Sequence, residues 1–375
     1  MTKKDISITL SAFFMKLIGC WLVRTDGERR LRTLAVVYTF FILCFSIYIF
    51  ITDMYHSLDD IDNFLYVAAH FLMSITSLLK CSLLYRNKQR FLKLMIYTRT
   101  HFWDIEYNED EQVTSVYQFM FFPRISETVS GNATVIVLPF RMWPVLGIPI
   151  YDTPYFEILF IVQAFCCFQI GLSFVALDNF LILINTHTAC QFQILQLRFT
   201  NLFDTSSKLI EQPDYADRCY KNLKACIQQH QALIEYCIRA EAVFSFNILI
   251  YVVVFGVGTF FIPNDLLQGD ISVERRVCFI LYVGGIILQL LLITHSCGIL
   301  ITESTNIGSV VYATLWPVLS TNRSGRMLRR HIHMIILRSQ KPCQLTAGGF
   351  FPVSLQTLVS TAVSYFTLLK QSSES

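Results

Sequence analysis

The stretch Val353-Ser-Leu-Gln-Thr-Leu-Val-Ser-Thr-Ala-Val-Ser-Tyr-Phe-Thr-Leu-Leu-Lys-Gln371 decides how the rest of the chain is read. As a helix it measures about 28 Å at ~1.5 Å per residue, which is enough to span a bilayer. Polar side chains recur along it at Thr357, Ser360, Ser364 and Gln371, a spacing that puts them on one face. The stretch therefore predicts a membrane helix that can line a pore. The alternative is that small hydroxylated residues let helices pack closely in lipid.

The composition supports a membrane setting. The chain is 54% hydrophobic and 15% charged, whereas a soluble domain carries roughly 25% charged residues. No cleavable signal peptide is apparent, because the first long apolar stretch begins near Thr33 and is long enough to stay as a signal anchor. All 12 Cys fall in predicted spans or predicted cytoplasmic segments, where thiols stay reduced.

Six segments are apolar and long enough to cross a bilayer. They are Leu34–Ile51, Phe64–Leu84, Tyr155–Ile184, Ala242–Ile262, Val277–Thr302 and Val353–Gln371. Loop charges predict a seventh span, because the basic segment 85–112 and the basic-poor segment 139–154 should lie on opposite sides of the membrane. We expect that span at Val113–Leu138. The sequence thus predicts an all-α membrane protein of seven transmembrane helices, with a cytoplasmic N-terminus and an outer C-terminus.

Polar helical segments extend the predicted bundle into a cytoplasmic docking domain. Apolar residues recur at helical spacing between Thr186 and Arg239, with a break at 211–214, and again between Glu303 and Arg338. The first set is Phe192, Leu195, Phe199, Leu202, Leu223, Cys226, Ile227 and Leu233, and the second is Ile307, Val311, Leu315, Leu328, Ile332 and Ile335. We expect five regions: helices one to four in 1–185, a cytoplasmic extension in 186–241, helices five and six in 242–302, a cytoplasmic anchor helix in 303–352, and the pore-lining helix with its tail in 353–375. The basic cluster Arg323, Arg326, Arg329 and Arg330 is most simply a solvated or lipid-headgroup face.

Other function classes find less support. A G-protein-coupled receptor has its N-terminus outside, and no Asp-Arg-Tyr follows the third span. A secondary transporter needs paired broken helices and intramembrane charges at matching positions of two halves, and the sequence suggests neither. An enzyme is not indicated, because the eight His are scattered and Gly256-x-Gly258 and Gly284-Gly285 lie within spans, where small residues permit close packing. We expect no cofactor, no metal and no nucleic-acid partner.

The segment Arg338–Phe351 and the end of the last span, Val363-Ser-Tyr-Phe-Thr-Leu-Leu369, resemble the C-terminal signature of insect odorant receptors. Leu138-Pro-Phe-Arg-Met-Trp-Pro144 is similar to the family's second outer loop, and Trp316 stands where the family has a Trp before the last span. The ending also approximates that of the related gustatory receptors, but Ser372 replaces their final Phe and favours the odorant branch.

The resemblance implies an odorant-gated, non-selective cation channel, a tetramer whose pore is lined by the seventh span of each subunit. The chain looks like a tuning receptor, which assembles with a shared co-receptor in the plasma membrane of a sensory dendrite. The family's hydrophobic constriction aligns with Leu368 and its polar ring with Gln371, and Ser364 shares their helix. A gustatory-type channel of the same superfamily and a metabotropic seven-helix receptor are the alternatives.

The resemblance also implies that the odorant binds in the outer halves of the second, third, fourth and sixth spans. The candidates there are Tyr66, His70, Phe71, Met73, Ser74, Ser126, Val129, Ser130, Ala133, Phe165, Phe168, Gln169, Leu172, Phe279, Tyr282, Val283 and Ile286. Aromatic walls with a few hydroxyls, one His and one amide suit a small volatile molecule with one polar group. The alternative is that these aromatics are core or lipid-facing residues and that His70 is an interhelical donor.

The predicted orientation can be tested with an epitope tag after Ser375. An odd number of spans puts the two ends of the chain on opposite sides, so we expect antibody to bind this tag on intact, unpermeabilised cells. A tag before Met1 should become accessible only after permeabilisation. The opposite pattern would contradict the predicted orientation and favour a metabotropic receptor, and two tags on the same side would contradict the seven spans.

Overall fold

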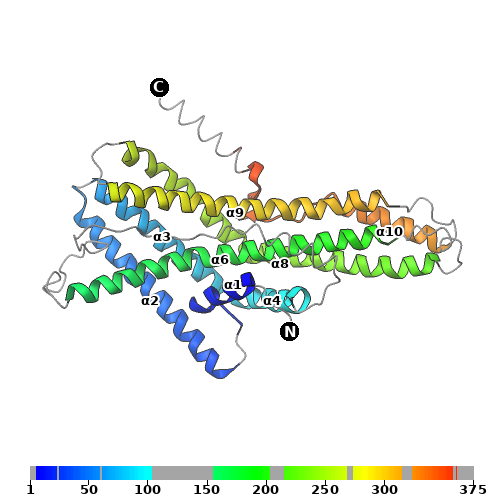
Figure 1. The fold of residues 1–375 in the computed structure, drawn as a ribbon, viewed down its shortest axis with the longest axis horizontal. Helices are drawn as coiled ribbons and strands as arrows, with labels where there is room; N and C mark the ends of the chain where they lie inside the picture. Colours follow the sequence, from blue (N-terminus) through cyan, green and yellow to red (C-terminus); the bar gives the residue numbers. More distant parts are fainter. Residues whose placement is uncertain are drawn as a thin grey trace. The chain divides into compact units, whose positions relative to one another are not determined.

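The computed structural model describes residues 6–22, 25–59, 61–103, 155–202, 215–267, 273–314, 323–357 and Ser360 (Figure 1). The elements are α1 (Ile6–Leu17), α2 (Asp26–His56), α3 (Ile61–Arg86), α4 (Lys88–Thr98), the π-helical turn η1 (Arg99–Trp103), α6 (Tyr155–Thr200), α8 (Tyr215–Leu267), α9 (Val273–Tyr312), α10 (Arg323–Ser339), β1 (Thr346–Ala347) and β2 (Phe351–Pro352). The predicted all-α fold is confirmed for these residues, apart from the small antiparallel hairpin of β1 and β2.

Five of the described helices contain stretches long and apolar enough to cross a membrane. They are Asp26–His56, Tyr66–Arg86, Glu157–Thr200, Asp217–Gly256 and Val283–Ala313. Each contains or overlaps one of the six clear spans expected from the sequence. The predicted span Val113–Leu138 lies outside the described residues, and so does most of Val353–Gln371, of which Leu355–Thr357 form a helical turn.

Three helices are much longer than a bilayer requires. Helices α6, α8 and α9 have 46, 53 and 40 residues, whereas a crossing helix needs roughly 20. The excess length confirms that helices continue beyond the predicted spans. Most of their periodic apolar residues are buried as expected: Phe192, Leu195, Phe199 and Leu202 on the α6 side, and Leu223, Cys226 and Leu233 on α8. Ile227 of the same set is half-buried.

The chain divides into two compact units. The first holds the described residues up to Leu92, those of α6 up to Leu181, and those between Phe246 and Leu290. In this unit α2 and α3 lie side by side, and their buried Leu43, Phe50 and Val67 belong to one apolar cluster (Figure 1). No disulfide joins any two of the described cysteines, so the described cores of both units form without such bonds.

Helix α2 begins with a capping box. The Thr25 hydroxyl accepts a hydrogen bond from the Glu28 amide at 3.3 Å, and the Glu28 carboxylate accepts one from the Thr25 amide at 3.4 Å. Two amides at the helix start, which no helical carbonyl can reach, are satisfied in this way. This local pattern explains why the apolar helix starts at Asp26.

The second unit holds the remaining described residues, including α10. One face of α10 is apolar and buried at Leu328 and Ile332, while Arg326 and Arg330 are exposed. The predicted amphipathic helix is therefore confirmed at these positions, and the contact of its basic face with solvent or lipid headgroups stays a prediction.

The structure shows no close packing at three of the glycines that the sequence analysis placed within spans. A methyl group added to Gly256, Gly284 or Gly285 would meet nothing within 4 Å in the part of the chain that the structure describes. The close approach occurs at Gly308 on α9, where an added methyl would lie 3.2 Å from Cβ of Ser339 on α10. Close packing thus depends on which face of a helix carries the glycine, and the sequence alone does not give that face.

Candidate functional site

The predicted ligand residues of α3 lie in or near the interior of the first unit. Ser74 is buried, and Tyr66, His70, Phe71 and Met73 are half-buried. The His70 ring lies against the Tyr66 ring, with centroids 4.6 Å apart, and its Nδ1 donates to the Tyr66 carbonyl at 2.9 Å. The Ser74 hydroxyl donates to the His70 carbonyl at 3.0 Å. Two successive turns of α3 therefore gather a phenol, an imidazole and a hydroxyl on one face.

The predicted residues of α6 divide into two groups. Gln169 and Leu172 are buried, and the Gln169 amide donates to the Thr39 hydroxyl of α2 at 2.9 Å. Phe165 and Phe168 are 57% and 60% exposed. Exposed rings on a membrane helix can contact lipid, a neighbouring subunit or a bound molecule, so the role of these two in the ligand site stays a prediction.

The remaining predicted residues are only partly described. Ile286 of α9 is buried and Val283 is half-buried. Phe279 and Tyr282 lie on α9, among residues for which only the helical backbone is described. Outside the described residues lie the third-span candidates Ser126, Val129, Ser130 and Ala133, together with the pore candidates Ser364, Leu368 and Gln371. The described helices thus provide part of the predicted ligand site.

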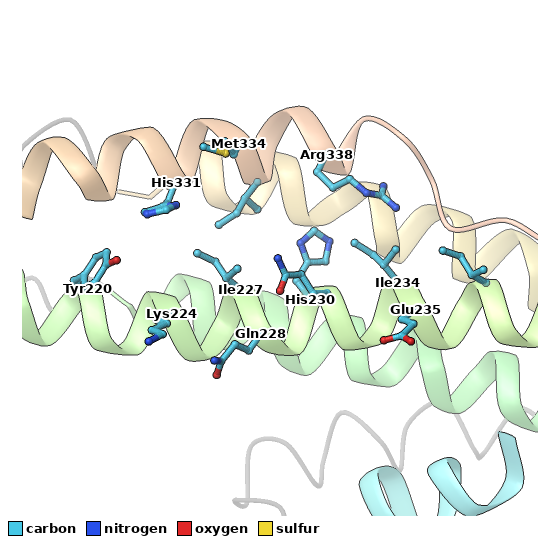
Figure 2. Close-up of a pocket in the computed structure, with 13 residues that line it drawn as sticks. Tyr220, Lys224, Ile227, Gln228, His230, Ile234, Glu235, His331, Met334 and Arg338 are labelled. Carbon is cyan, nitrogen blue, oxygen red and sulfur yellow. The ribbon is translucent and has the colours of Figure 1, made fainter. Parts of the chain in front are cut away.

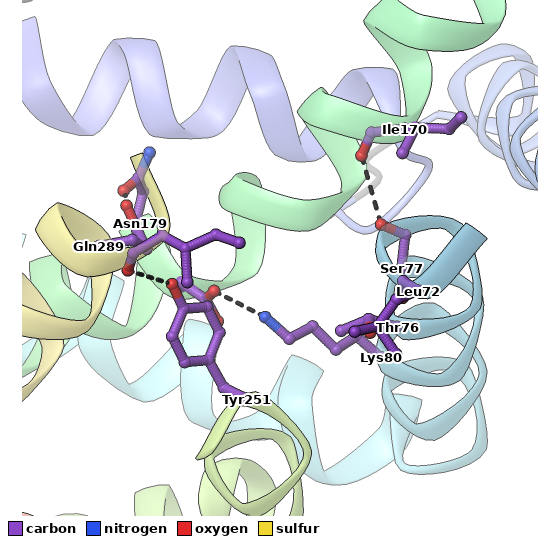
Figure 3. A network of polar contacts seen from close by, with 10 residues as sticks. Leu72, Thr76, Ser77, Lys80, Ile170, Asn179, Tyr251 and Gln289 are labelled. Carbon is purple, nitrogen blue, oxygen red and sulfur yellow. Dashed lines mark hydrogen bonds and ion pairs between the residues drawn. The ribbon is translucent and has the colours of Figure 1, made fainter. Parts of the chain in front are cut away.

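A buried ion pair in the first unit was missed in the sequence (Figure 3). Nζ of Lys80 on α3 lies 2.7 Å from Oδ2 of Asp178 on α6, and both side chains are almost fully buried. The ammonium also lies 4.5 Å from the Phe174 ring centre and 4.6 Å from that of Tyr251 on α8. A carboxylate and two aromatic faces are the groups that stabilise a cation out of water.

Tyr251 extends this arrangement to a fourth helix. Its hydroxyl donates to the Ile286 carbonyl of α9 at 2.8 Å. Nearby, the Gln289 amide of α9 donates to the Asn179 side-chain oxygen of α6 at 3.2 Å. The sequence carried a signal for this site, since Lys80 and Asp178 are opposite charges inside two predicted spans, and such residues are expensive unless paired.

The second unit has a groove between α8 and α10 (Figure 2). Its volume is about 720 Å³, and its lining is Tyr220, Lys224, Ile227, Gln228, His230, Gln231, Ile234, Glu235, Ile238, His331, Met334, Ile335 and Arg338. Burial, followed by the charge of Arg338, lowers the pKa of His230 to about 4, at a position before the predicted span Ala242–Ile262. None of the predicted ligand residues lines this groove, so it is distinct from the predicted odorant site.

The C-terminal signature forms a hairpin that packs against α8 within the second unit. Thr346 pairs with Pro352 and Ala347 with Phe351. Gly348 and Gly349 make the turn at φ of 62° and 82°, a region that glycine enters without steric cost. The two glycines of the signature are therefore required by the backbone.

Glu241 of α8 holds this hairpin. Its carboxylate accepts hydrogen bonds from the Thr346 amide, at 2.8 Å, and from the Thr346 hydroxyl. The Ser245 carbonyl accepts another from the Gly348 amide at 3.0 Å. These contacts fix the hairpin to α8 directly before the last predicted span.

The last predicted span begins with a local cap. The Ser354 hydroxyl accepts a hydrogen bond from the Thr357 amide at 3.2 Å, the three-residue spacing of a helix N-cap. Val353 is tied back to the hairpin, because its amide donates to the Leu345 carbonyl at 2.8 Å. The start of this helix is thus set by the hairpin and by Ser354.

The Glu241 contacts predict how Thr346 variants behave. Thr346→Val keeps the side-chain shape but removes the hydroxyl, so we expect it to lower stability by about 1–3 kcal/mol, because the Glu241 carboxylate and the Gly349 amide each lose a partner. Thr346→Ser, the matched control, keeps the hydroxyl and should stay close to wild type. The difference in unfolding temperature is measured on the detergent-solubilised receptor, with size-exclusion chromatography as the readout of unfolding. Equal unfolding temperatures for the two variants would contradict the role of this hydrogen bond.

Residues 60–366 of the chain match the protein family described as 7tm Odorant receptor. Among curated proteins, Odorant receptor 13a of Drosophila melanogaster is 28% identical over 195 residues, which cover 49% of this chain and 46% of that protein. Odorant receptor 10 of Aedes albopictus is 22% identical over 94% of both chains. The matched part of the chain spans 46% of the length of Odorant receptor 13a and 59% of that of Odorant receptor Or2 of Anopheles gambiae, which is 22% identical.

Solved structures give the same fold. The olfactory receptor OR5 of the insect Machilis hrabei, in complex with eugenol, matches with a TM-score of 0.73 over 97% of both chains, at 14% identity. A second structure of the same receptor matches with a TM-score of 0.70. At this identity the likeness establishes the fold and not the ligand.

Proposed function

Since the chain belongs to the insect odorant receptor family, a family of multi-pass membrane proteins and not of enzymes, we propose that it is a subunit of an odorant-gated, non-selective cation channel. The observation that carries this proposal is the family match over residues 60–366, joined to the fold shared with OR5 along nearly the whole chain. The seven-span topology with a cytoplasmic N-terminus belongs to the same proposal, because the loop charges favour it.

The proposed ligand is a small, largely apolar volatile molecule with one polar group. The described part of the site offers aromatic and aliphatic surface with few polar groups, chiefly His70, Ser74 and Gln169. A ligand held mainly by buried apolar area gains roughly 25 cal/mol per Å². Tuning should be broad, because one methylene group discriminates by only about 1–3 kcal/mol. Eugenol, which is bound in the OR5 complex, fits this chemical class.

The proposed pore is lined by the last helix of each subunit. A ring of Leu368 side chains would exclude water from a narrow pore, and the amides of Gln371 could replace part of a cation's hydration shell. Ser364 would continue the polar face toward the described start of the helix at Ser354. The proposed assembly is a hetero-tetramer with the family's co-receptor, in the plasma membrane of a sensory dendrite.

Currents from cells that express the chain with a co-receptor test the proposed function. We expect eugenol or another volatile aromatic of a panel to evoke a non-selective cation current that persists when G-protein signalling is blocked. Cells with the co-receptor alone provide the control. A tagged receptor that reaches the surface but gives no current with any odorant, or only a G-protein-dependent response, would contradict the proposal.

The ligand site is tested in the same cells by His70→Ala and Tyr282→Ala. Each change removes a polar group and ring surface from the proposed site, so we expect the EC50 to rise by roughly tenfold, which corresponds to ~1.4 kcal/mol of lost contact. Surface density of the receptor, measured by the extracellular tag, should not change. If the odorant ranking and the EC50 remain those of the wild type in both variants, the odorant binds elsewhere.

A further inference from the structure

The ion pair of Lys80 and Asp178 is not explained by stability alone. Burying two charges carries a desolvation cost that their attraction often fails to recover, and apolar residues of similar volume are frequently as stable. The side chains of Lys80 and Asp178 are 0% and 5% exposed, so both are withdrawn from water. Ionisable residues inside membrane helices usually serve a function for this reason. The cost of the pair therefore points to a role beyond holding the fold.

The contacts of Lys80 join four helices (Figure 3). Its ammonium binds Asp178 of α6 directly, at 2.7 Å, and lies on the Tyr251 ring of α8. The Tyr251 hydroxyl then donates to the Ile286 carbonyl of α9. One cation on α3 thus connects α6, α8 and α9, and we name this set of groups the Lys80 junction.

The Lys80 junction adjoins the proposed odorant residues along the helices. Lys80 follows Ser74 by six residues on α3, and Asp178 follows Leu172 by six on α6, which places each charge about 9 Å farther along its helix. Ile286 belongs to both groups, since its side chain is a proposed ligand contact and its carbonyl accepts the junction's hydrogen bond. A displacement of α3, α6 or α9 by a bound ligand would reach the junction directly.

We propose that Lys80, Asp178 and Tyr251 are positioning residues that couple odorant binding to the arrangement of α8 and α9. This inference rests on the proposed function and names residues that carry it. A buried ion pair tolerates few intermediate arrangements, because partial separation leaves a charge without its partner. Movement of one helix is therefore passed on to Tyr251 and Ile286 rather than absorbed locally, as in other switches built on packed elements.

The first test replaces both charges. Lys80→Met with Asp178→Leu keeps similar volumes and leaves no buried charge alone, so the full-length receptor should still fold. With the co-receptor present, and with eugenol or the volatile aromatic that activates the wild type as the probe, we expect the EC50 to rise about tenfold, within the usual range of allosteric coupling. Surface density should stay at the wild-type level. Lys88→Met on α4 is the matched control and should leave the EC50 unchanged.

The second test isolates Tyr251. Tyr251→Phe keeps the ring over Lys80 and removes the hydroxyl that donates to the Ile286 carbonyl, so we expect the EC50 to rise about threefold, as for the loss of one ordinary hydrogen bond. In the background of the two charge replacements the same change should add no further shift, because residues of one network are not additive.

Three results would overturn the inference. The first is a wild-type EC50 and maximal current in the charge-replaced receptor at equal surface density. The second is a Tyr251→Phe shift that adds fully to that of the charge replacements. The third applies if the charge-replaced receptor does not reach the surface. In that case a wild-type dose–response for the single variant Tyr251→Phe would overturn the inference. In each of these results the wild-type receptor still responds to the odorant, so the proposed function stands. A wild-type receptor that does not respond would overturn both the proposed function and this inference.

Discussion

The structure depends on one constraint, that a helix in lipid must satisfy its polar groups within the protein because the hydrocarbon interior offers no water. Backbone groups meet this constraint through the long helices themselves. The side chains of Lys80 and Asp178 meet it by pairing with each other, with the rings of Phe174 and Tyr251 around the cation. Such a pair can form only when its helices are correctly placed. The charges of Lys80 and Asp178 therefore favour the packing of α3, α6 and α8 that brings them together.

The apolar runs of the sequence predicted much of this architecture. Five of the six clear spans correspond to described helices, and the amphipathic spacing correctly marked Leu223, Leu328 and Ile332 as buried. These features are predictable because helix period and bilayer thickness act on each segment separately. The hairpin at Thr346–Pro352 was not foreseen, since its strands have only two residues each and its stability comes from a distant carboxylate on α8.

The candidate site was less predictable, because a pocket depends on how faces of separate helices meet. The sequence identified α3 residues that do lie inward, such as Ser74, but it could not show that Phe165 and Phe168 face outward on α6. From the sequence we also found no matching charges within the predicted spans, and so we overlooked that Lys80 and Asp178 carry opposite charges in two of them. Pairing opposite charges between predicted spans would identify this contact from the sequence alone, because an isolated charge within a membrane helix is so costly.

The proposed channel requires a water-filled pathway walled by copies of the last helix. Cysteines introduced singly at Thr357, Ser364 and Gln371 probe this pathway through their reaction with a charged, water-soluble thiol reagent during odorant application. In open channels we expect rapid modification and altered current at these three positions, and none at Val359 or Val363 on the opposite face. Modification of neither face, or of both faces alike, would contradict it.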